Sequence, residues 1–186
     1  MRCFPTLALA ASMMLAAPAD AQELTEAQYQ EAHCIVLYVP EGDVTEDVVQ
    51  GYVGANLSAD ASAVVKQAQD ACVAKYGWDA NALNLATTIA FAFLSIEWHE
   101  AMAEQMEISA SLTRNLQPVA DGLSSEEQTA LFLSQEGPEL EAKVRRLFVA
   151  QGAPGSDGAF MVLLQLFRDS LIHPTQLERF ADARFP

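Results

Sequence analysis

The sequence predicts an all-α fold, a compact bundle of about seven or eight helices around a long central helix. Apolar residues recur at helical spacing along the chain, and no stretch shows the alternation of a half-buried strand. Capping residues, glycines and prolines divide the chain into helical lengths. One long apolar stretch near the middle, residues 79–116, is the natural centre of such a bundle.

The first 21 residues have the pattern of a secretory signal peptide. Arg2 gives a positive start, residues 7–17 form an apolar run, and residues 19–21 read Ala-Asp-Ala, a cleavage site. We therefore expect a mature chain, 22–186, that forms a single helical domain, with an acidic half at 22–116 and a helical half at 117–186 as the alternative division. The short signal suits a bacterial periplasm, and full secretion is the alternative.

A first helix is predicted to begin at Thr25, since Thr25 and Gln28 have the spacing of a capping box. Its apolar residues continue to about Tyr38. Pro40 and Gly42 then end it, because proline lacks a backbone donor and glycine favours turns.

Two further helices are predicted before the central stretch. Asp43 or Thr45 can cap the second, and Ser58 or Asp60 can cap the third. The third should stop at Gly77, since glycine readily adopts the left-handed conformation that ends helices.

Two cysteines remain after removal of the signal peptide, Cys34 and Cys72. In an oxidising compartment an even pair predicts a disulfide. Cys72 lies on the apolar face of the third helix, so the bond would tie the first helix to the third. Cys3 belongs to the signal peptide and takes no part.

The central stretch is predicted to be one long helix or two helices joined end to end. Its first half, residues 83–98, is apolar almost all round, which indicates a buried or a membrane-spanning helix. The run is shorter than the roughly 20 apolar residues of a spanning helix, and it is interrupted by polar side chains. We therefore expect a core helix and a mature form that does not span the membrane.

The second half of the stretch carries a row of carboxylates at helical spacing: Glu97, Glu100, Glu104 and Glu107. His99 lies at the border between this row and the apolar face. The row predicts a solvent-facing side, and a cation site is the alternative. Glu97, His99, Glu100 and Glu104 are the candidate site residues if the protein is an enzyme.

Two helices are predicted to follow the central stretch. Ser124 and Glu127 form a second capping box. Gly137 ends that helix, and Pro138 opens the next, because proline is tolerated in a first helical turn.

The last part of the chain is predicted to hold two more helices. After the flexible loop 152–158, an apolar helix should run from Ala159 to about Ile172. Pro174 is predicted to break it, leaving a short final helix.

The formal net charge of −15 bears on the kind of partner. Loss of Arg2 and Asp20 with the signal peptide leaves this charge unchanged. Residues 22–115 hold 14 acidic side chains and three basic ones, so the negative field belongs mainly to the first half. Such a charge repels nucleic acid and anionic lipid and favours a basic or amphipathic protein partner.

No motif for catalysis, metal binding or cofactor binding is present. His33, His99 and His173 do not share a metal-ligand spacing, and the chain has no H-E-x-x-H, G-x-S-x-G or S-x-x-K. The sequence therefore predicts no catalytic residue, metal or cofactor. It favours an exported, non-catalytic protein that binds another macromolecule. A carrier of an apolar small molecule, held among phenylalanines and methionines, is the alternative.

Overall fold

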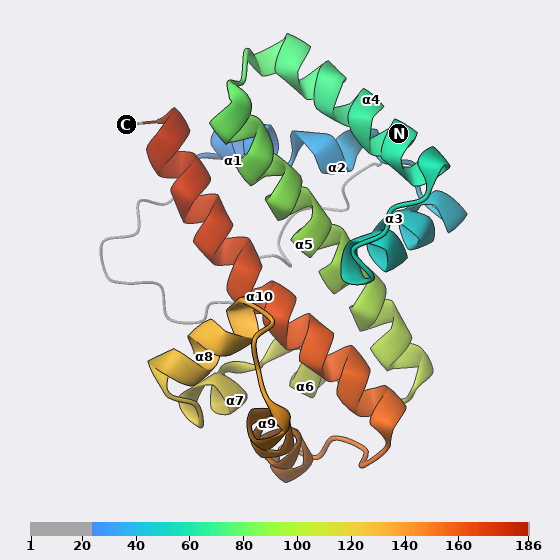
Figure 1. Cartoon of the computed structure of the whole chain (residues 1–186), viewed down its shortest axis with the longest axis vertical. Coiled ribbons are helices and arrows are strands. Elements are labelled where there is room, and N and C mark those ends of the chain that lie inside the picture. The colour runs from blue at the N-terminus through green and yellow to red at the C-terminus, as the bar shows by residue number, and fades with distance from the viewer. Residues whose placement is uncertain (1–23, 186) are drawn as a thin grey trace. The chain divides into compact units, whose positions relative to one another are not determined.

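The computed structural model describes residues 24–185, apart from the side chain of Asp43. Over that range the protein is all-helical, with ten helices and no strand, which confirms the predicted fold class. The predicted signal peptide, residues 1–21, lies outside the described residues. The helices are, in order, α1 Glu26–Ala32, α2 Cys34–Tyr38, α3 Asp43–Val53, α4 Ala59–Tyr76, α5 Ala80–Gln105, α6 Ala110–Arg114, α7 Gln117–Asp121, α8 Ser125–Phe132, α9 Pro138–Ala150 and α10 Asp157–Arg184 (Figure 1).

The described chain divides into two compact units. The first contains residues 24–98 and 172–185, and the second contains residues 99–171. Each unit has its own hydrophobic core. The long helices α5 and α10 contribute residues to both units.

The first unit begins with the predicted capping box. The Thr25 hydroxyl accepts from the backbone N–H of Gln28 at 3.3 Å, and the Gln28 side chain accepts from the Thr25 N–H at 2.8 Å. The expected single helix to Tyr38 is interrupted at His33, which has φ −95° and ψ 12° and is the C-cap of the first helix. α1 and α2 are therefore separate helices.

The ends of α3 and α4 follow local sequence signals, with one correction. Ser58 caps α4, and Gly77 ends it with φ +65°, as predicted. The cap of α3 is Gly42, with φ +91°, so the expectation of Asp43 or Thr45 is wrong. The Thr45 hydroxyl donates instead to the carbonyl of Pro40 at 2.6 Å and stabilises the turn before the helix.

The core of the first unit surrounds the predicted disulfide. Cys34 and Cys72 are bonded at an S–S distance of 2.07 Å, which joins α2 to α4 and confirms the pairing. α2 and α3 both pack against α4. The larger buried side chains of this core are Ile35, Val36, Val39, Val48, Val49, Val65, Trp78, Leu85, Ile89, Leu94 and Phe180.

α5 and α6 show that the central stretch is two helices, one of the two predicted forms. Asp79 opens α5 by accepting from the N–H of Ala82 at 2.8 Å. Glu107 adopts φ +58° after the last turn, where the N–H of Ile108 donates to the carbonyl of Ala103 at 2.9 Å. This wrapped end stops the helix, so Glu107 lies beyond it.

α5 is long and apolar enough to cross a membrane by length and composition alone. Half of its most apolar window is buried inside the protein. A core helix of a soluble protein passes the same test.

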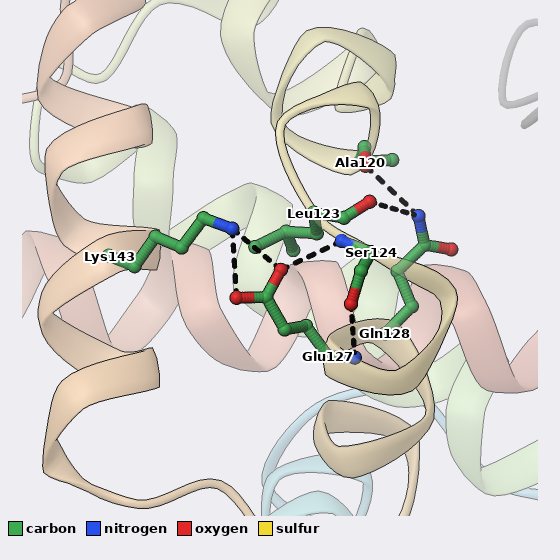
Figure 2. Close-up of polar contacts among 6 residues, drawn as sticks. All are labelled: Ala120, Leu123, Ser124, Glu127, Gln128 and Lys143. Atoms are coloured by element: carbon green, nitrogen blue, oxygen red, sulfur yellow. Dashed lines mark hydrogen bonds and ion pairs between the residues drawn. The ribbon is translucent and has the colours of Figure 1, made fainter.

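The second unit contains a polar junction between α8 and α9 (Figure 2). The carboxylate of Glu127 accepts from the Ser124 N–H at 2.7 Å and completes the predicted capping box. It also accepts from the ammonium of Lys143 on α9, at 2.6 and 2.8 Å. The Lys143 hydrogen bond, followed by that of Ser124, lowers the pKa of Glu127. The side chain of Gln128 donates to the carbonyl of Ala120 at 3.0 Å, which holds α8 to the end of α7.

The second unit also has an apolar core. Pro138 occupies the first turn of α9, as predicted. α7 packs against α9. The larger buried side chains are Ile108, Leu112, Leu116, Val119, Leu131, Val144, Phe148, Phe160, Val162, Leu163, Leu164, Leu166 and Phe167.

α10 is one continuous helix, so the predicted break at Pro174 is wrong. A proline inside a helix removes one backbone hydrogen bond and costs about 3 kcal/mol. That cost is offset because the residues after Pro174 are anchored: Phe180 is fully buried, and Gln176 is 7% exposed. Continuing the helix keeps these contacts.

The Ser124 cap leads to a first testable prediction. Ser124→Ala removes the acceptor for the Glu127 N–H at the start of α8, and we expect a loss of about 1 kcal/mol in the free energy of unfolding. Urea denaturation followed by circular dichroism measures it. Ser125→Ala is the matched control, because its exposed side chain is not the cap, and it should change stability by less than about 0.5 kcal/mol. Equal losses in both variants would contradict the assignment of the cap.

Candidate functional site

The four candidate residues on α5 do not form one cluster. Glu97 and Glu104 are exposed, whereas His99 is buried at 8% exposure. On a helix, positions 99 and 104 point about 140° apart. Glu100 is half-buried. Burial raises its pKa, and the nearby charge of Arg114 opposes that shift. Among the described residues, no group of three or more histidine, cysteine, aspartate or glutamate side chains could hold a metal ion.

The first unit instead brings together two histidines that are 140 residues apart in the chain. His33 lies at the turn between α1 and α2, and His173 lies on α10. Their Nε2 atoms are 2.8 Å apart, the distance of a hydrogen bond between the rings. Sequence reasoning missed this pair because it looked for histidines at short, metal-ligand spacings.

The hydrogen bonds assign the tautomers of the two rings. The Nδ1 of His33 is 2.9 Å from the carbonyl oxygen of Tyr29, which can only accept, so Nδ1 carries the hydrogen. In a neutral His33 ring Nε2 is then an acceptor. His173 must donate from its Nε2, and the pair shares one N–H between the two facing nitrogens.

Aromatic rings surround the pair. The ring of Tyr29 stacks on His33 with centroids 4.0 Å apart, and the ring of Phe93 on α5 lies 5.3 Å from His33 and 5.9 Å from His173. This setting offers little solvation to a charged imidazole. His33 is 3% exposed, and His173 is partly buried.

The site shifts the acid–base behaviour of three side chains. Burial lowers the pKa of His33 to about 4, against a smaller opposing effect of the bond to Tyr29. Burial and the neighbouring His33 lower the pKa of His173 to about 3. Burial raises the pKa of Tyr29 to about 12, and the carboxylates of Glu26 and Glu97 add to that rise. Both histidines are therefore neutral at physiological pH.

A second polar contact lies close by in the sequence, at the buried Glu31. The Glu31 Oε1 accepts from Trp78 Nε1 at 3.0 Å and from Arg184 Nε at 2.9 Å. Arg184 also donates to the carbonyl of Tyr76, at the end of α4, at 3.0 Å. Glu31 and His33 thus each bind a residue of the C-terminal part of α10. Figure 1 shows this part of α10 alongside the first half of α5.

The surface of the described residues is strongly acidic. Among side chains that the structure describes, 16 carboxylates are exposed, against five basic groups. The ion pairs found within residues 24–185 neutralise only a part of this charge: Lys66–Asp70, Lys143–Glu127, Arg145–Asp157, Arg168–Glu136 and Arg184–Glu31.

Comparison of the chain with protein-family models, with curated proteins and with solved structures found no match.

Proposed function

We propose that the exported chain is a non-catalytic protein of the cell envelope that binds a basic or amphipathic protein partner. The observation that carries this proposal is the negative charge of the protein surface. Exposed carboxylates outnumber exposed basic groups by 16 to five among the described side chains.

A field of one sign favours association with an oppositely charged protein. It raises the encounter rate and rejects partners of the same sign, and its effect falls as salt screens it. The same field opposes binding to nucleic acid, whose phosphates are negative.

The end of α5 shows how acidic and apolar groups combine on this surface. Met106 is 38% exposed, and its neighbours in the chain, Glu104 and Glu107, are exposed as well. The Met106 methyl group lies close to Gly158 at the start of α10: a Cβ atom added to Gly158 would be 3.1 Å from it. Met161, one helical turn after Gly158, is 58% exposed. Flexible methionine side chains adapt to apolar partner surfaces, so this region of the second unit suits a helix with basic and apolar faces.

A peptide titration tests the proposal. The probe is a synthetic basic amphipathic helix, compared with a scrambled peptide of the same composition, at about 20 mM and 300 mM salt. We expect the amphipathic peptide to bind the mature protein more tightly than the scrambled one. Its affinity should fall at least about tenfold at the higher salt, because charge contacts are screened.

Two double variants with equal loss of charge locate the contact. Glu104→Gln/Glu107→Gln should weaken peptide binding about fivefold or more, whereas Glu139→Gln/Glu141→Gln, at the start of α9, should weaken it less than twofold. Equal binding of the two peptides, or equal effects of the two double variants, would reject this surface as the binding site.

A further inference from the structure

Two polar contacts hold the last part of α10 to the first helices of the same unit. His173 shares a hydrogen bond of 2.8 Å with His33, and Arg184 bonds Glu31 through Nε at 2.9 Å. The first contact requires at least one neutral imidazole, and the second is strongest with a charged carboxylate. Acid opposes the first condition, because it charges both histidines.

We propose that residues 172–185 are an acid-released segment, which separates from α1 and α2 when His33 and His173 become protonated. This inference goes beyond the proposed function and does not depend on it.

The proton count explains why protonation would break the contact. The neutral pair has one hydrogen between its two Nε2 atoms. One added proton can be accommodated as an imidazolium that donates to the remaining neutral ring. A second proton leaves two N–H donors and two positive charges facing each other across 2.8 Å, with no acceptor between them.

The charged groups around the pair do not remove this repulsion. On α1 and α5, the carboxylates of Glu26 and Glu97 act on Tyr29, whose ring covers His33. On α1 and α10, Glu31 and Arg184 bond each other. Burial places the pKa of His33 at about 4 and that of His173 at about 3, so release requires marked acidity.

Release of this segment would expose apolar surface. Phe180 is fully buried, and its ring meets the ring of Trp78 edge-on with centroids 5.8 Å apart. The ring centroids of Phe180 and Phe185 are 6.1 Å apart. Leu177 packs against the same core. The acid form would therefore present an apolar face that is absent at neutral pH.

Hydrogen exchange of the full mature, oxidised chain tests the proposal. After correction for the intrinsic exchange rate, we expect peptides from 172–185 to exchange at least about tenfold faster at pH 3 than at pH 7. Peptides from α9, residues 138–150, should keep their protection under the same conditions. Simultaneous loss of protection throughout the chain would overturn the proposal.

Variants separate the histidine pair from general acid effects. His33→Gln/His173→Gln replaces both rings with side chains that stay neutral at every pH, and it should abolish the tenfold change in 172–185 at pH 3. His99→Gln, a buried histidine of the second unit, is the matched control and should leave the change intact. An unchanged acid response in the double variant would overturn the proposal.

A measurement on the unaltered protein covers the case in which the double variant does not fold. Nitrogen-15 spectra of the histidine rings report their tautomers and titration. We expect a neutral His33 with hydrogen on Nδ1, and two rings that titrate below about pH 5. Titration of both rings near 6.5, the value of a free histidine, would overturn the proposal.

Discussion

Replacing Cys34 and Cys72 together with alanine is expected to lower the free energy of unfolding by about 4 kcal/mol. The bond closes a loop between positions 38 residues apart, and in the chain-entropy model its main effect is to restrict the unfolded chain. Both side chains are fully buried, at the contact between α2 and α4. Guanidinium denaturation followed by circular dichroism at neutral pH measures the change.

Reduction of the unaltered protein provides the control for this prediction. A reducing agent opens the same bond without changing a side chain, so it should reproduce most of the loss seen in the double alanine variant. A loss below about 1 kcal/mol in both experiments would mean that helix packing alone holds α2 against α4.

Lowering the pH from 7 to 4 is expected to cost about 3 kcal/mol of stability from His33 alone. Its pKa is about 4 in the folded protein and 6.5 in an unfolded chain. Between these values the unfolded state binds more protons than the folded state, so acid favours unfolding. The stabilisation that His33 contributes in its neutral form is complete above pH 6.5 and is lost as the pH falls toward 4. His173, whose pKa is about 3, adds a loss of the same sign.

Denaturation curves at several pH values between 7.5 and 4 check this prediction. The unaltered protein should lose stability across that window, and His33→Gln should have a clearly flatter pH dependence because it removes one titrating group. His99→Gln should keep the dependence that comes from His33. Parallel curves for the unaltered protein and His33→Gln would show that His33 is not the source.

The features that could be predicted from the sequence depend on residues close together in the chain. Thr25 with Gln28, and Ser124 with Glu127, satisfy the first amide groups of their helices within a single turn. Gly77 ends α4 because its own backbone adopts φ +65°. The disulfide joins residues that are far apart in the chain, yet its pairing could be predicted. Only two cysteines remain after the predicted cleavage, so Cys34 and Cys72 had no other partner.

The features that could not be predicted depend on contacts between distant residues. The local rule for proline predicted a break at Pro174, but buried contacts further along α10 outweigh the loss of one backbone bond. The candidate site on α5 was based on spacing along one helix, and the structure places His99 in the interior and Glu104 in solvent.

The sequence by itself determined the helical class, most of the caps and the pairing of Cys34 with Cys72, because turn geometry and composition act locally. Only the tertiary structure decided that His33 meets His173 and that Glu31 meets Arg184. These contacts join residues 140 and 153 positions apart. Such pairs form when packing brings two helices together, and no local pattern in either helix specifies the other.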